Sequence, residues 1–208
     1  NSLTNCKRAI DCGIDKILQT FGIDLENQKN KDFASEIISK FTKPKSDLPY
    51  KLKLIESLGF TTGKILSDIR TTRNKLEHDY EYPKVQEVED SIDIAKMFID
   101  LIQAKFYIFE SHFVISDENN EKDELSFENY CDVSYDSETF EFKVWTSKNK
   151  TYNPHQLSVK GDYTYRFPDK EYLALIRMTN TIQDKIDLKD SFVYLLETIK
   201  HPLPKEHI

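Results

Sequence analysis

The feature that most constrains the fold is a run of apolar residues spaced alternately three and four apart, which begins just after Pro83. This spacing places the side chains on one face of a helix, and it continues for more than three heptads. We therefore expect a long, packed helix from about residue 85 to residue 109. Its apolar residues are Val85, Val88, Ile92, Ala95, Ile99, Ile102, Phe106 and Phe109.

A second apolar strip on the same predicted helix consists of Phe98, Leu101 and Ile108. A helix with two apolar strips contacts more than one neighbour. The neighbour is first expected inside the same bundle, and another subunit is the alternative.

Four helical patterns precede this helix. The first covers about residues 10–21 and stops at Gly22, the second covers 33–41 and ends at Lys43-Pro44, and the third covers 52–58 and stops at Gly59. A longer helix is expected over about residues 62–80, with Ile65, Ile69 and Leu76 on one stripe. Residues 1–113 are thus predicted to form an all-α bundle.

The composition changes near Phe113. An acidic segment at residues 117–124 reads as a connection, and β-rich stretches with alternating apolar residues follow at 130–135, 139–145 and 157–167. Residues 172–178 fit either a strand or a helix; a strand is favoured because Tyr172-x-Ala174-x-Ile176 alternates. Residues 189–200 are predicted to form a final helix. The fold class is therefore α+β, with a helical region at 1–113 and a β-rich region with a C-terminal helix at 114–208.

Charge and cysteine content narrow the class of protein. The 208-residue chain has a net charge of −7, which argues against a large non-specific nucleic-acid surface, although residues 40–75 are locally basic. That local bias is equally compatible with an ordinary solvated surface. We see neither an apolar run long enough to span a bilayer nor a secretion signal, and the three cysteines show no ligand spacing. These features predict a cytoplasmic protein with reduced thiols.

The chemistry is concentrated in one octapeptide, Arg73-Asn74-Lys75-Leu76-Glu77-His78-Asp79-Tyr80. On a helix, Asn74 and His78 project toward solvent or a partner, while Arg73 and Tyr80 lie at the edge of the buried face. Arg73 can bind a phosphate through two parallel hydrogen bonds, and His78 can exchange a proton near neutral pH. Taken singly, Arg73 and His78 are more often on a solvated or ion-paired surface, and Tyr80 is more often at the edge of the core. Arg73 and Glu77 could simply form an ion pair.

An RNA substrate supplies its own nucleophile, the 2′-hydroxyl group, so cleavage needs only positioning, an acid or base, and charge stabilisation. No metal is required, and His112, His155, His201 and His207 show no zinc spacing. We therefore expect neither a metal site nor a cofactor. One helix cannot enclose such a ligand, but a second copy across a two-fold axis could.

The pattern Arg73-Asn74-x3-His78-x-Tyr80, late in one long helix and followed by another, resembles the HEPN superfamily. The resemblance covers about half of the chain and implies a bundle of about five helices that dimerises around a composite cleft. It implies that Arg73 and His78 are the catalytic pair of a metal-independent endoribonuclease, with Asn74 in support. Tyr80, Glu77 and Arg70 are candidate binding or regulatory residues.

Tyr80 extends the motif to the form found in HepT-like toxins. The resemblance there implies adenylylation of the tyrosine by a nucleotidyltransferase antitoxin, in a toxin, antiphage or stress system. Minimal HEPN proteins lack the region after residue 113. The alternative function is a non-catalytic HEPN module that binds nucleotide or RNA or serves in dimerisation.

Overall fold

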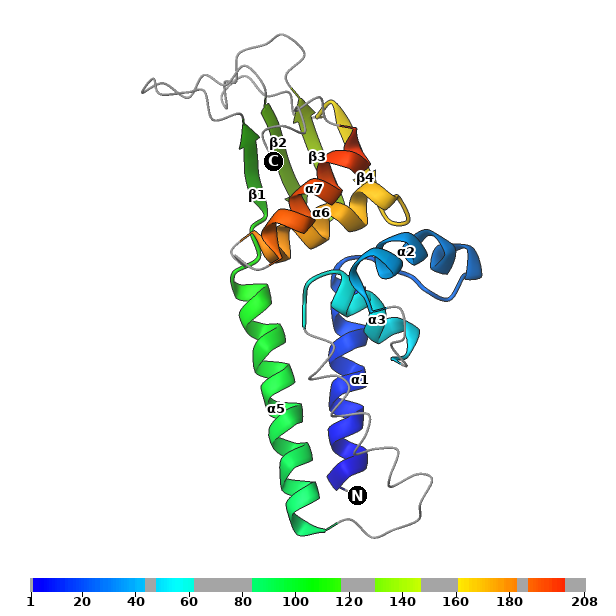
Figure 1. Cartoon of the computed structure of the whole chain (residues 1–208), viewed down its shortest axis with the longest axis vertical. Helices are drawn as coiled ribbons and strands as arrows, with labels where there is room; N and C mark the ends of the chain where they lie inside the picture. The colour runs from blue at the N-terminus through cyan, green and yellow to red at the C-terminus, as the bar shows by residue number, and fades with distance from the viewer. Residues whose placement is uncertain are drawn as a thin grey trace. The chain divides into compact units, whose positions relative to one another are not determined.

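The computed structural model describes residues 2–43, 48–61, 84–116, 130–146, 161–182 and 187–200. The chain divides into two units, Asn1–Phe109 and Glu110–Ile208 (Figure 1). Helices come first, strands follow, and helices close the chain, so the mixed α+β class is confirmed. The first strand already begins at His112, and the change from helix to strand therefore comes slightly before the boundary expected at residue 113.

Two long helices, α1 (Ser2–Thr20) and α5 (Val85–Tyr107), lie side by side in the N-terminal unit and run in the same direction (Figure 1). They approach closely at Gly13, where an added Cβ would lie 3.2 Å from Ile99 Cδ1 and 3.3 Å from Phe98 Cε1. Glycine permits this approach because it has no side chain. Helix α1 buries Ile10, Ile14, Ile17 and Leu18, which confirms the predicted apolar face.

The long predicted helix is confirmed as α5, and its buried face combines the two predicted strips, because Ala95 and Ile102 of the main stripe are buried together with Phe98. Phe98, assigned to the second strip, is fully buried and lies against α1, whereas Val85 of the main stripe is 75% exposed. The reason is that α1 meets α5 at Phe98, Ile99 and Ile102. Ile108, the end of the second strip, is 41% exposed.

Helices α1 and α3 (Tyr50–Ser57) end at the two predicted glycines. Gly22 and Gly59 have φ of 60° and 80°, values that favour glycine at the end of a helix. Next to these ends, Phe21 lies 5.5 Å from Phe60 and 6.0 Å from Phe106, measured between ring centroids. The C-terminal ends of α1 and α5 and the chain after α3 therefore meet in one aromatic cluster.

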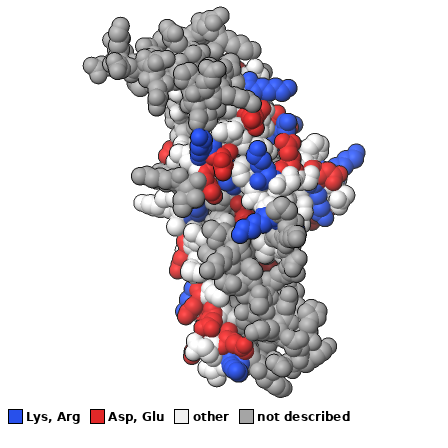
Figure 2. All heavy atoms as spheres, viewed as in Figure 1, with Lys and Arg blue, Asp and Glu red and all other residues white. Residues whose placement is uncertain are grey.

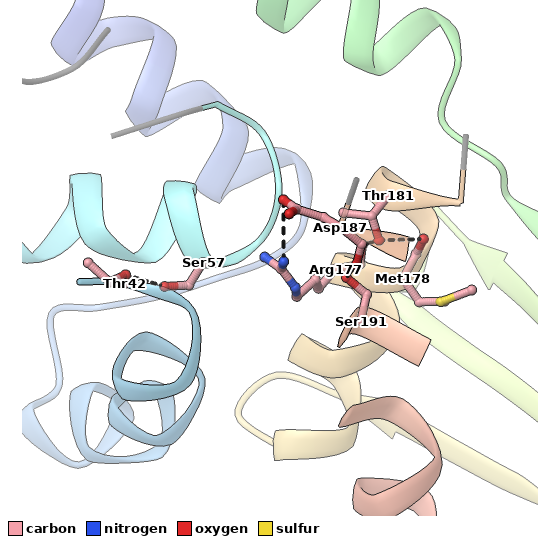
Figure 3. A network of polar contacts seen from close by, with 7 residues as sticks. All are labelled: Thr42, Ser57, Arg177, Met178, Thr181, Asp187 and Ser191. Atoms are coloured by element: carbon pink, nitrogen blue, oxygen red, sulfur yellow. Dashed lines mark hydrogen bonds and ion pairs between the residues drawn. The ribbon is translucent and has the colours of Figure 1, made fainter. Parts of the chain in front are cut away.

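Helix α2 (Gln28–Phe41) starts at the N-cap Asn27, whose side chain accepts a hydrogen bond from Lys29 N at 3.0 Å. It packs against α3, and the two ends are joined by a buried hydrogen bond of 2.8 Å between the hydroxyl groups of Thr42 and Ser57 (Figure 3). The second and third predicted helices are thereby confirmed.

The C-terminal unit contains a four-stranded antiparallel sheet in the order β1-β2-β3-β4. Its strands are β1 (His112–Ser116), β2 (Tyr130–Asp136), β3 (Glu141–Thr146) and β4 (Tyr163–Arg166). Asp136 closes the turn between β2 and β3, because its carboxylate accepts hydrogen bonds from Glu138 N at 3.0 Å and Thr139 N at 3.3 Å. Those bonds hold the pKa of Asp136 below its usual value.

Two helices, α6 (Lys170–Thr181) and α7 (Leu188–Ile199), complete this unit. The expected strand at residues 172–178 is wrong, because these residues lie in α6. Every residue from Tyr172 to Thr181 is buried, so this helix has no solvent-facing side. Its apolar residues therefore lack the spacing of three and four that identifies a half-exposed helix. Helix α7 confirms the predicted final helix.

Helix α6 covers one face of the sheet. The ring of Tyr172 lies 5.4 Å from that of Phe142, which shares its face with Val133 and Val144. Helix α7 packs against α6, and Arg177 pairs with Asp187 at 3.6 Å (Figure 3). In the same network Ser191 Oγ donates to Asp187 O at 2.8 Å.

Candidate functional site

The octapeptide lies outside the residues that the structure describes. The predicted roles there remain predictions from the sequence; they concern Arg70, Arg73, Asn74, Glu77, His78 and Tyr80. The expected helix over residues 62–80 lies outside the described ranges as well.

The described residues on either side of this segment lie at opposite ends of α5. Phe60 contacts Phe106 near the C-terminal end, with ring centroids 6.0 Å apart, whereas Lys84 is the N-cap of α5. The 23 residues of α5 rise about 1.5 Å each, which puts the two ends roughly 33 Å apart. The chain between residues 61 and 84 must cover about that distance.

The N-terminal half of α5, which follows the octapeptide, is acidic (Figure 2). Lys84 N donates to Glu87 Oε2 at 3.0 Å, and Glu89, Asp90 and Asp93 are exposed. Carboxylates near a helix N-terminus are favourable to the helix but repel phosphate. Any polyanion bound near this end of α5 would need cations from elsewhere.

An open hollow of about 570 Å³ lies in the N-terminal unit where α1, the loop after it, α2 and the start of α3 meet. Two of the charged side chains on its rim are paired with each other, because Lys51 Nζ lies 2.6 Å from Asp15 Oδ1. The Tyr50 hydroxyl group donates to Lys31 O at 2.6 Å, and burial, with a smaller effect of Asp32, raises the pKa of Tyr50 to about 12. Tyr50 is therefore a fixed neutral donor rather than an acid or base at neutral pH.

The face of the sheet opposite α6 contains an imidazole–carboxylate pair. His112 Nε2 lies 3.1 Å from Asp132 Oδ1, with the histidine side chain 54% exposed and the aspartate side chain fully buried. Asp132 is on the central strand β2, where Val114 and Trp145 are its partners on the two sides. Among the described residues, this pair most resembles the histidine–carboxylate pairs that serve in acid–base catalysis.

Aromatic residues surround this pair. Tyr130 and Trp145 form a small buried cluster with Val114. Burial raises the pKa of Tyr130, and the carboxylates of Asp162 and Asp132 raise it further. Tyr130 therefore stays protonated at neutral pH.

Cys131, on the other face of β2, does not offer a nucleophile. Burial, with a smaller effect of Asp132, raises the pKa of its thiol to about 12. The reactive form of cysteine is the thiolate, which is scarce at neutral pH when the pKa is this high.

Metal-binding clusters and membrane-spanning helices are both absent from the described parts of the chain. Within the six described ranges, no cluster of three or more His, Cys, Asp or Glu side chains is placed to hold a metal ion. Over the same ranges, no helix combines the length and the apolar character needed to cross a bilayer.

Comparisons with protein-family models, with curated proteins and with solved structures found no match for this chain. The HEPN resemblance therefore depends on the octapeptide and its helical context.

The pair of His112 and Asp132 was not predicted. From the sequence, His112 was considered only as a possible zinc ligand, and it lacks the spacing of one. The two residues are twenty positions apart, and they meet only through the register that pairs His112 with Ser134 and Val114 with Asp132. Alternation within a strand shows which residues share its face, but it does not fix the register against the neighbouring strand.

Proposed function

We propose that the protein is a metal-independent endoribonuclease of HEPN type that acts as a dimer. The observation that carries the proposal is the spacing of Arg73, Asn74, His78 and Tyr80 within two helical turns. It combines a permanent cation, an amide, an imidazole and a phenol, which is the minimum that phosphodiester cleavage requires when the substrate provides the nucleophile.

The N-terminal unit supports the proposal in two ways. Its described residues are helical, as a HEPN domain requires, and α5 follows the octapeptide directly.

The proposed reaction is a transesterification. His78 takes the proton from the 2′-hydroxyl group, the oxygen attacks the adjacent phosphorus, and the bond from phosphorus to the 5′ oxygen breaks. The departing 5′ oxygen takes up a proton from the imidazolium ion that has formed. Arg73 stabilises the negative charge that builds on the phosphate oxygens, and Asn74 orients the ring or the phosphate. The products are a 2′,3′-cyclic phosphate and a 5′-hydroxyl end.

The test is cleavage of a mixture of single-stranded and structured RNAs in EDTA. We expect the wild-type protein to cleave, and His78→Ala and Arg73→Ala to lose at least a hundredfold in rate. Lys75→Ala is the matched control, because it removes a neighbouring cation outside the motif and should lose less than threefold. Intact RNA with the wild type, or equal cleavage by His78→Ala, would contradict the proposal.

Dimerisation and regulation belong to the same proposal. Two copies would bring their octapeptides to one cleft, which sedimentation of the protein at micromolar concentration tests directly. In a toxin–antitoxin pair, a partner nucleotidyltransferase would adenylylate Tyr80. Intact mass after co-expression with such an enzyme would rise by one adenylyl group in the wild type and stay unchanged in Tyr80→Phe.

The acidic N-terminal half of α5 favours a second candidate, a non-catalytic HEPN module that binds nucleotide or serves in dimerisation. Carboxylates beside the octapeptide would weaken its attraction for a long polyanion. RNA or nucleotide binding without cleavage, unchanged in His78→Ala, would favour this alternative.

A further inference from the structure

The sheet of the C-terminal unit has two outer strands, β1 and β4, one at each side of the order β1-β2-β3-β4 (Figure 1). Each outer strand bonds to a neighbour on one side, and the backbone groups of every second residue point away from that neighbour. Such an edge is a template on which a further strand can add. Proteins usually guard these edges with charged side chains, proline, bulges or covering segments.

The edge of β4 is guarded by the turn that follows it. Arg166 N donates to Asp169 Oδ2 at 3.0 Å, and Asp169 N donates to Arg166 O at 2.8 Å. Because backbone direction alternates along a strand, Thr164 also points its backbone groups away from β3. A strand added beside β4, which is only four residues long, would have to displace Asp169. The edge of β4 is therefore a poor template.

The edge of β1 has no such guard among the described residues. The strand is five residues long and contains neither proline nor a permanently charged side chain. Tyr135 N donates to Ser111 O at 2.7 Å, which fixes how the backbone direction alternates along β1. The residues of β1 whose backbone groups point away from β2 are His112, Val114 and Ser116.

The sequence of β1 is complementary to itself in an antiparallel pair. If the pair is centred on Val114, the two valines lie opposite each other, and His112 lies opposite Ser116 of the second copy. The outward backbone groups of these residues would then form about six hydrogen bonds between the copies. Like charges do not come opposite each other, because β1 contains no carboxylate, lysine or arginine.

The faces of the two sheets also match in this arrangement. Phe113 and Ile115 are both 6% exposed, and Phe113 is paired with Val133 on the face that α6 covers. In a pair centred on Val114, Phe113 would lie opposite Ile115 of the second copy, and an aromatic residue opposite a β-branched one is a favourable cross-strand pair. A two-fold axis normal to the sheet keeps these apolar residues on the same face in both copies.

We propose that β1 pairs antiparallel with β1 of a second copy, centred on Val114, so that the two four-stranded sheets become one continuous sheet. The contact belongs to the C-terminal unit, Glu110–Ile208, and does not depend on the octapeptide. It gives the C-terminal unit a role in assembly. A chain that also dimerised around the octapeptide would use two different two-fold contacts and would assemble beyond a dimer.

Ser116→Pro tests the pairing in the full chain. The Ser116 N–H points away from β2, so proline should leave the β1–β2 pairs in place while it removes a donor and obstructs the added strand. In sedimentation we expect the dissociation constant of the assembly to rise at least tenfold. Thr164→Pro is the matched control, because it makes the same change at the outward position of β4, and its dissociation constant should stay within twofold of the wild type. A wild-type protein that is monomeric at about 500 µM, or equal assembly of the wild type and Ser116→Pro, would overturn the proposal.

Hydrogen exchange of the Val114 amide in the wild type decides the question if Ser116→Pro fails to fold. This N–H also points away from β2, so pairing with a second copy should protect it. Its protection should rise at least tenfold from about 5 to about 500 µM, whereas that of the Thr164 amide should not change. Protection of Val114 that is independent of concentration would show that a segment of the same chain covers the edge, and fast exchange at both concentrations would show that the edge is open. Either result would refute the pairing of two copies.

Discussion

The contact between α1 and α5 at Gly13 makes a quantitative prediction for Gly13→Ala. In an isolated helix, alanine is more favourable than glycine by about 1 kcal/mol. Here the new Cβ would lie 3.2 Å from Ile99 Cδ1, 3.3 Å from Phe98 Cε1 and 3.4 Å from Ile102 Cδ1. The ends of the isoleucines can move by a few tenths of an ångström, but the Phe98 ring is fully buried.

Overpacking of this kind costs about 1–3 kcal/mol, which exceeds the gain in helix propensity. We therefore expect Gly13→Ala to destabilise the N-terminal unit by about 1 kcal/mol. Urea unfolding followed by circular dichroism at 222 nm gives the free energy of unfolding. An increase in stability of about 1 kcal/mol would show that the two helices do not touch at this position.

Removal of the clashing atom tests the cause. Ile99→Val deletes the Cδ1 atom that lies 3.2 Å from the new Cβ. In that background Gly13→Ala should cost less than in the wild type, but it should not be neutral, because the Phe98 ring still lies 3.3 Å from the new Cβ. Ile92→Val is the matched control, since it trims an isoleucine of the same helix that is not among the three nearest contacts. The cost of Gly13→Ala should be unchanged there.

Three further predictions concern the buried groups. Tyr172→Phe removes the hydrogen bond between the hydroxyl groups of Tyr172 and Tyr135 and should lower the free energy of unfolding by about 1–2 kcal/mol. Tyr163→Phe, at an exposed position, should lower it by less than about 0.5 kcal/mol. Urea unfolding followed by Trp145 fluorescence measures both, and equal losses would contradict the burial of Tyr172. Iodoacetamide at pH 8 should label the exposed Cys12 in the native protein and leave Cys131, with its pKa raised to about 12, unlabelled until urea is added, as read by peptide mass. Burial also raises the pKa of Tyr50 and Tyr165 to about 12, as it does for Cys131. The stability that Tyr50, Tyr165 and Cys131 contribute is therefore complete below about pH 9, where the unfolded chain begins to lose its protons. It is lost as pH rises toward 12. Urea midpoints that stay constant from pH 8 to 11 would refute this.

The helical half could be predicted from local signals because those signals are strong. The spacing of apolar residues in α5 persists for several turns, and Gly22 and Gly59 mark the ends of α1 and α3. The burial of Phe98 beside Ala95 and Ile102 could not be predicted, because it depends on where α1 approaches. Gly13 is the residue that permits the approach, and nothing in the α5 sequence points to it.

Helix α6 shows the limit of periodicity. Residues 172–176 alternate as a strand does, but every side chain from Tyr172 to Thr181 is buried, so apolar residues occupy all sides of the helix. The better signal was at its start, where Asp169 is the N-cap and Glu171 lies in the first turn.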